Sequence, residues 1–233
     1  MKQIENKKFT ILLYSELDKV KEKEKIEEFL STIIQNFAQE SFRFYKEWNE
    51  FPFVYRERQL YSALIPAIYS YTTNIWIEQP FQSLQSKQRF LDIVTSLEEN
   101  IYFIELKHSY KSKQNTLRKD TIKKWEDALE QISSIKKESV GAFYKEKFKQ
   151  YKIALMIMPY FLPSSQKVNK NEATILEETL NLFKKSFKKE EHPNFITLIA
   201  LKEYKNYIHY FEDGAKKEVY PFLFFIAKVE EVT

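Results

Sequence analysis

The stretch Ile101-Tyr102-Phe103-Ile104-Glu105-Leu106-Lys107-His108 decides how this chain folds. Its β-branched and aromatic residues favour a strand, in which residues two apart share a face. Glu105 and Lys107 therefore project together, and the residues beside them point the other way. The strand predicted before it carries one acidic residue, Asp92. If residues 95–100 turn the chain back, Asp92 comes alongside Glu105, and two carboxylates lie next to an ammonium group.

That combination of groups is typical of a site for a hard divalent cation such as Mg²⁺ or Mn²⁺. Asp92 and Glu105 would bind one or two ions and Lys107 would position a water molecule, which is chemistry suited to phosphodiester hydrolysis. The alternative is a salt bridge across two strands on an exposed sheet face, worth at most about 1 kcal/mol. The neighbouring Ile101 and Phe103 favour the cation site, because charges in apolar surroundings are costly without a role.

The composition of the chain limits the kinds of site that it can form. With 233 residues, of which 43% are hydrophobic, the chain can bury one sizeable core, so we expect a single domain. The absence of cysteine excludes disulfides and thiolate zinc sites, and three scattered histidines leave oxygen atoms as the expected metal ligands. No run approaches the roughly 18 apolar residues of a membrane span, and the start has no apolar signal region. We therefore expect a cytoplasmic protein without membrane contact.

Hydrophobic periodicity predicts a mixed α/β fold with helices on both faces of a central sheet. The predicted helices are residues 15–48, residues 55–70 with a kink at Pro66, a helix that Asp120 and Thr121 cap, and residues 172–188. The predicted strands are residues 74–78, 89–95, 100–107, 151–159 and 195–201, followed by a hairpin of residues 207–211 and 219–229 around Asp213-Gly214. This order implies an antiparallel start to the sheet and then a crossover.

The order helix, three strands, helix, strand, with Asp92 on the second strand and Glu105-Leu106-Lys107 on the third, resembles the PD-(D/E)XK nuclease superfamily. Glu-x-Lys occurs three times, at residues 5–7, 105–107 and 203–205, but only the middle copy lies in an apolar alternation after a strand with an aspartate. The resemblance implies a restriction-endonuclease-like core (α-β-β-β-α-β) over residues 55–161. Residues 1–54 would be an N-terminal helical extension, and residues 162–233 would add a helix and strands.

The resemblance also implies roles for five residues in a catalytic site. Asp92 and Glu105 are similar to the family's metal ligands, and Lys107 to its catalytic lysine. Glu57 resembles a glutamate that many members carry on the first core helix, where it would complete the shell of a second ion; alternatively it favours the helix dipole. Gln131 is similar to a polar residue that some branches place beside the metal, and the alternative is a helix-surface amide.

Two positions depart from the family pattern. Leu91 precedes Asp92 where the motif has proline, and Ile135 stands where the RecB-like branch has tyrosine. The proline is often missing, so the first departure changes little. The second speaks against membership of the RecB-like branch. His108, just past the third strand, could contact the scissile phosphate, but a residue at such a place is more often simply exposed, and we expect exposure.

The activity implied by the resemblance is a Mg²⁺- or Mn²⁺-dependent endonuclease that cleaves DNA and leaves 3′-hydroxyl and 5′-phosphate ends. Basic residues directly follow the predicted site and could contact DNA phosphates, or they could form an ordinary solvated face; they are Lys111, Lys113, Arg118 and Lys119. The alternative function is a non-catalytic nucleic-acid-binding or protein-interaction module on the same fold. By family analogy, the chain could also act as a homodimer or within a multi-component bacterial defence complex.

Overall fold

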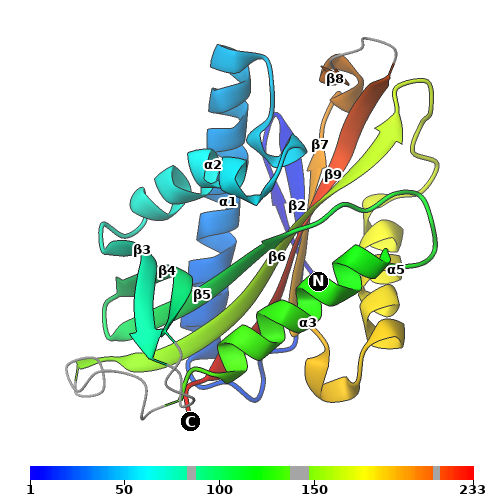
Figure 1. The fold of residues 1–233 in the computed structure, drawn as a ribbon. Coiled ribbons are helices and arrows are strands. Elements are labelled where there is room, and N and C mark those ends of the chain that lie inside the picture. The colour runs from blue at the N-terminus through cyan, green and yellow to red at the C-terminus, as the bar shows by residue number, and fades with distance from the viewer. Residues whose placement is uncertain (83–87, 137–146, 212–215) are drawn as a thin grey trace.

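The computed structural model describes residues 1–82, 88–136, 147–211 and 216–233 (Figure 1). The strands are β1 (Lys2–Glu5), β2 (Phe9–Ser15), β3 (Ile75–Gln82), β4 (Gln88–Leu97), β5 (Asn100–His108), β6 (Lys149–Pro163), β7 (Phe195–Leu201), β8 (Ile208–Tyr210) and β9 (Lys217–Glu231). The described helices are α1 (Lys23–Trp48), α2 (Glu57–Tyr69), α3 (Lys119–Ser133) and α5 (Glu172–Ser186), with short 3₁₀ turns η1 (Pro52–Val54), η3 (Lys189–Glu191) and η4 (Tyr204–Asn206).

The described strands form a nine-stranded mixed sheet in the order β1-β2-β7-β9-β6-β5-β4-β3, with β8 paired to β9. Strands β3, β4 and β5 are antiparallel, and β6 lies parallel to β5 after the crossover through α3. The α/β class, the antiparallel start and the crossover agree with the prediction. The C-terminal hairpin is also present, although the turn predicted at Asp213-Gly214 lies outside the described residues.

Helices cover both faces of this sheet and bury two hydrophobic cores. Helices α1 and α2 pack on one face, and α3 and α5 pack on the other (Figure 1). Strand β5 divides its side chains between the two cores: Ile104 and Leu106 face α1 and α2, whereas Ile101 and Phe103 face α3. The alternation therefore directs Glu105 and Lys107 toward the α3 side of the sheet.

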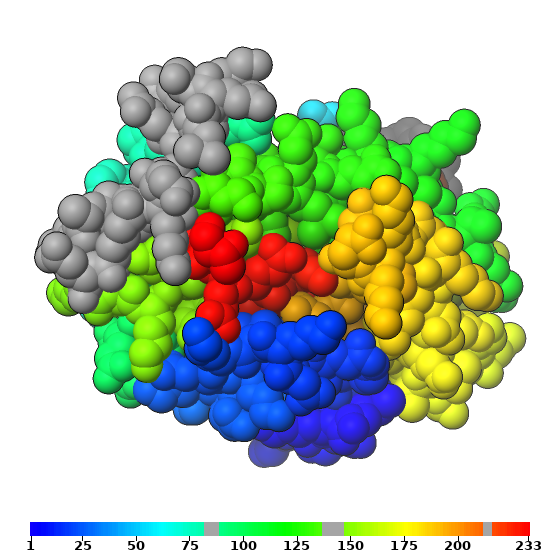
Figure 2. Space-filling view, turned by 90° about the horizontal axis from the view of Figure 1, so that it is seen from below, coloured from blue at the N-terminus to red at the C-terminus, as the bar shows by residue number. Residues whose placement is uncertain are grey.

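The N-terminal segment differs from the predicted helical extension. Strands β1 and β2 come first, and β2 pairs with β7, so this segment extends the sheet. The long helix begins at Lys23 instead of at residue 15. Glu22 has a left-handed φ of 53°, which a right-handed helix cannot include. The C-terminal end of β9 lies beside the segment before α1 on the underside (Figure 2), where the Lys21 amide donates a hydrogen bond to Glu231 Oε1 at 2.8 Å.

The predicted cap of the helix over β5 is also corrected. Helix α3 begins at Lys119, with Arg118 as its N-cap and no side-chain cap bond. Asp120 lies inside the first turn and pairs with Lys124 at 2.9 Å. The hydroxyl of Thr121 is buried and forms a hydrogen bond of 2.6 Å with Ser109 Oγ, so it anchors the helix to the chain after β5. In the described part of the chain, no helix combines the length and apolarity needed to cross a bilayer.

Candidate functional site

The register of β4 and β5 brings Asp92 next to Glu105. The pairing of these strands runs from Leu97 opposite Asn100 to Ile93 opposite Ile104. Just beyond that last pair, Asp92 Oδ2 accepts a hydrogen bond of 2.7 Å from the backbone N–H of Leu106. The Asp92 carboxylate thus accepts a hydrogen bond from the backbone of β5 just beyond the described pairing of the two strands. This bond holds Asp92 against the strand that carries Glu105.

Glu105 is a buried carboxylate with an unsatisfied oxygen. Its residue is 1% exposed, and Oε1 pairs with Lys107 Nζ. Within the described residues no hydrogen-bond donor reaches Oε2. Burial and, after it, the nearby Asp92 raise the pKa of this carboxyl to about 8, against the opposing effect of Lys107. The exposed sheet face of the predicted alternative is therefore wrong, because this carboxylate lies inside the protein, but a salt bridge is present, between Glu105 and Lys107 of one strand.

Lys107 is half-buried beside the two carboxylates. Its Nζ contacts the Glu105 carboxylate and donates a hydrogen bond of 3.2 Å to the carbonyl oxygen of Leu106. Burial would lower the pKa of this ammonium, but Glu105, and then Asp92 and Glu57, raise it above its ordinary value. Lys107 therefore carries its proton and its charge at neutral pH.

Glu57 reaches the end of β5 from the first turn of α2. Its Oε2 accepts a hydrogen bond of 3.2 Å from the backbone N–H of His108. Burial raises the pKa of Glu57, Lys107 lowers it, and Asp92 raises it. The carboxylate thus points toward the sheet, where it interacts electrostatically with Lys107 and Asp92.

His108 is buried, and the expectation that it would be exposed is wrong. It is 3% exposed, and its ring Nε2 lies 3.1 Å from the carbonyl oxygen of Phe53 in η1. Burial lowers the pKa of the imidazole to about 4, so the ring is neutral at neutral pH. The turn η1 covers the end of β5, which the sequence pattern of β5 does not reveal.

Tyr61 is a neighbour of the site that was not among the predicted site residues. It is half-buried one turn after Glu57. Burial raises the pKa of its phenol, and so do the carboxylates of Asp92, Glu57 and Glu105. Its spacing of four residues from Glu57 puts both side chains on one helix face, and that spacing is the signal that could have identified it.

The other predicted site residues lie in different surroundings. Gln131 is half-buried near the end of α3, its carbonyl oxygen accepts hydrogen bonds from Ser134, and no described hydrogen bond joins its amide to the carboxylates. Lys111 is buried, whereas Lys113, Arg118 and Lys119 are exposed. The three exposed residues keep their predicted role as phosphate contacts, and Lys111 lines a cavity that is described below.

Two carboxylates, not three, form the centre of the candidate metal site. Among the residues that the structure describes, no three His, Cys, Asp or Glu side chains are grouped to hold a metal ion. Asp92 and Glu57 each accept a hydrogen bond from one backbone N–H of β5, and Asp92 and Glu105 are the adjacent pair because they lie on neighbouring strands just beyond the pair Ile93 and Ile104. A cation bound between these hard oxygen donors would give the free oxygen of Glu105 a partner and would lower the high pKa of its carboxyl group.

Known proteins offer no guide to this site. No family model, curated protein or solved structure matches the chain.

Proposed function

We propose that this chain is a metal-dependent nuclease that hydrolyses DNA phosphodiester bonds. One observation carries the proposal: the buried Glu105 carboxylate has an oxygen without a donor in the described structure and lies beside Asp92 and the protonated Lys107. Such a group is costly to bury unless a cation or another partner completes it. The resemblance to the PD-(D/E)XK superfamily supports the same chemistry.

Asp92 and Glu105 would hold Mg²⁺ or Mn²⁺ through oxygen atoms, and Glu57 would contribute to the shell of a second ion. The carbonyl oxygen of Leu106, which lies 3.2 Å from Lys107 Nζ, is another hard donor at this place. When bound, the ion would neutralise charge on the scissile phosphate and lower the pKa of a water molecule. The residues fit that role because every donor is an oxygen and one of them has no described partner.

Lys107 would act through its charge. Because its pKa lies above the ordinary value, the amine keeps its proton at neutral pH and is a poor general base. Its Nζ–H groups would orient the attacking water and stabilise the negative charge that develops on the phosphate oxygens. Once a cation neutralises Glu105, Lys107 would be released from its pairing with that carboxylate and could turn toward the substrate.

DNA as the substrate, endonucleolytic cleavage and 3′-hydroxyl and 5′-phosphate products rest on the family resemblance. The exposed Lys113, Arg118 and Lys119 follow the site in the chain and would neutralise backbone phosphates. A cytoplasmic location belongs to the same proposal.

Plasmid nicking tests the proposal directly. Supercoiled DNA would be incubated with the protein and Mg²⁺ or Mn²⁺, and with the variants Asp92→Ala and Lys107→Ala. Lys7→Ala is a matched control, because Lys7 stands in another Glu-x-Lys triplet and is exposed. We expect nicking by the wild type and by Lys7→Ala, and loss of nicking in the two site variants. Equal activity in all four proteins would refute the proposal.

A second candidate is a non-catalytic nucleic-acid-binding or protein-interaction module on the same fold. It is favoured because, among the described residues, no third metal-ligating side chain joins the two adjacent carboxylates, and Lys107 already contacts one of them. Calorimetric titration with Mn²⁺ separates the two candidates. Binding by the wild type that disappears in Glu105→Gln supports the nuclease, and absence of binding by the wild type supports the module.

A further inference from the structure

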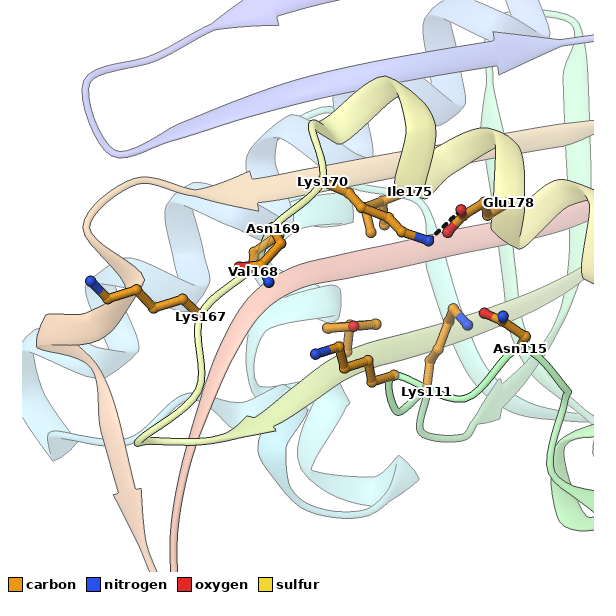
Figure 3. A pocket seen from close by; sticks show the side chains of 10 residues that line it. Lys111, Asn115, Lys167, Val168, Asn169, Lys170, Ile175 and Glu178 are labelled. Carbon is orange, nitrogen blue, oxygen red and sulfur yellow. Dashed lines mark hydrogen bonds and ion pairs between the residues drawn. The ribbon is translucent and has the colours of Figure 1, made fainter.

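A cavity of about 300 Å³ lies between the chain that follows β5 and the beginning of α5 (Figure 3). Its walls come from the segment after β5, from β6, from the loop before α5 and from the first turns of that helix. Four lysines line it together with one acidic residue: Lys111, Lys113, Lys167, Lys170 and Glu178. The cavity thus has an excess of positive charge.

Lys111 is the buried centre of this charge. It is 8% exposed, and its backbone is fixed to β6 by hydrogen bonds to Pro159 and Phe161 at 2.9 and 3.0 Å. Its Nζ lies 5.9 Å from the centre of the Tyr160 ring and donates a hydrogen bond of 3.3 Å to the carbonyl oxygen of Gln114. An ammonium group has three N–H donors, and in the described structure the ammonium group of Lys111 uses one of them, in this long hydrogen bond.

The one acidic residue that lines the cavity does not neutralise its four lysines. Glu178 already pairs with Lys170, as the dashed line in Figure 3 marks. The pKa of Lys111 is lowered to about 8, mainly by burial; Glu178 opposes this effect and Lys170 adds to it. A buried ammonium in this state would be stabilised by an anion that accepts its remaining hydrogen bonds.

The start of α5 adds to the positive potential on the same side. Ile175, in the first turn of this helix, lines the cavity. The N-cap Asn171 accepts a hydrogen bond of 2.8 Å from the backbone N–H of Thr174, and the helix dipole directs its positive end to this region. The dipole supplements the lysines, which carry most of the charge.

We propose that this cavity binds a small phosphate-bearing anion, with Lys111 as its buried anchor. A phosphate monoester has two negative charges and several strong acceptors, which match the surplus of ammonium groups. The cavity is at the lower end of the sizes found for ligand pockets, so its occupant is a phosphate with a small organic group or the end of a larger phosphorylated molecule. This inference does not depend on the proposed nuclease activity.

Calorimetry with inorganic phosphate and with deoxyadenosine monophosphate, in EDTA and without metal, tests the inference. We expect saturable binding that weakens about tenfold or more in Lys111→Gln, because a charge-assisted hydrogen bond in a buried site is lost. Lys185→Gln is the control, since Lys185 is exposed at the other end of α5 and does not line the cavity. Absence of binding by the wild type, or equal binding by Lys111→Gln, would overturn the inference.

A second variant keeps the test decisive if Lys111→Gln does not fold. Lys113 and Lys167 are exposed at the rim, so replacing both with Gln should leave the fold intact and weaken phosphate binding. Undiminished binding by that double variant would contradict the proposed site. Oligonucleotides with and without a terminal phosphate then identify the source of the ligand. Tighter binding of the phosphorylated strand, dependent on Lys111, assigns the cavity to a nucleic-acid end, and binding of the free monoester alone assigns it to a small molecule.

Discussion

Replacing Glu105 with glutamine is expected to stabilise the metal-free protein at neutral pH. The pKa of this carboxyl is about 8 in the folded protein, against an ordinary value of 4.5. Between these values the folded state retains a proton that the unfolded state has released, so the free energy of unfolding falls as the pH rises through this window. At pH 7 the corresponding cost is about 3 kcal/mol, and at pH 5 it is about 1 kcal/mol. Glutamine has a similar shape and cannot ionise. Glu105→Gln should therefore raise the free energy of unfolding by up to this cost.

Urea unfolding in EDTA at pH 5 and pH 7 measures this difference. Glu105→Gln should exceed the wild type by up to about 3 kcal/mol at pH 7 and by about 1 kcal/mol or less at pH 5. Glu126→Gln is the control, because Glu126 is exposed on α3 and its neutral form should leave the stability unchanged. A variant that is less stable than the wild type at pH 7, or a gap that is the same at both pH values, would show that the burial argument is mistaken.

Addition of Mg²⁺ extends the same experiment to the proposed metal site. A cation that binds only the folded state at one hundred times its dissociation constant adds about 2.7 kcal/mol to the free energy of unfolding. We expect this gain in the wild type and not in Glu105→Gln, so that excess Mg²⁺ narrows or reverses the gap between them. An identical effect of Mg²⁺ on both proteins would place the cation elsewhere.

Three further predictions concern single residues. Lys111 should titrate near pH 8, instead of near 10.5, when it is followed by ¹³C NMR of its ε-carbon. Its contribution to the free energy of unfolding should therefore increase as the pH rises from 8 to 10.5. A titration midpoint near 10.5 would contradict its burial. Asn171→Ala removes the cap bond to the Thr174 N–H and should lower the free energy of unfolding by about 1 kcal/mol in urea, against no change for the exposed Lys185→Ala. Glu57→Gln keeps an acceptor for the His108 N–H but loses the charge, so nicking with Mg²⁺ should fall about tenfold to hundredfold, and an unchanged rate would exclude Glu57 from the site.

The central strands could be predicted from the sequence because their apolar runs are buried and bounded by polar residues. Strand β7 spans the residues that were predicted, Phe195–Leu201, and β5 ends one residue later than predicted, at His108. All residues of β7 are buried, so its composition is constrained along its whole length. Local pattern and tertiary environment agree in such strands, and prediction is then reliable.

The N-terminal strands could not be predicted in the same way, because their partner is distant in the sequence. Strand β2 is stabilised by pairing with β7, nearly two hundred residues later, where Phe9 lies opposite Leu201. The start of α1 was also hidden, since the charged residues before it continue a helical composition while Glu22 adopts a left-handed conformation. No side-chain pattern encodes that backbone change.

The proximity of Asp92, Glu105 and Lys107 could be predicted because it requires only a strand period of two and a tight connection between β4 and β5. The burial of His108 and Lys111 could not, because it depends on η1 and β6 packing against the chain at and beyond the end of β5. Tyr61 was missed because its spacing from Glu57 puts both residues on one helix face but does not show that this face lies near the carboxylates. Prediction thus succeeded where contacts follow strand geometry and failed where they follow the packing of turns and helices.

The role of Asp92 can be separated from its structural contribution by a substitution that preserves shape. The structure gives Asp92 one purely structural task, which is to accept the hydrogen bond from the Leu106 N–H at 2.7 Å. Asparagine can accept the same bond through its side-chain oxygen, so a structural role predicts that Asp92→Asn folds and behaves as the wild type does. A metal role requires the negative charge, and it predicts retained stability with loss of both Mn²⁺ binding and nicking. If Asp92→Asn binds Mn²⁺ as the wild type does, the Asp92 carboxylate only accepts the hydrogen bond from the Leu106 N–H. The proposed metal site then loses one of its two central ligands.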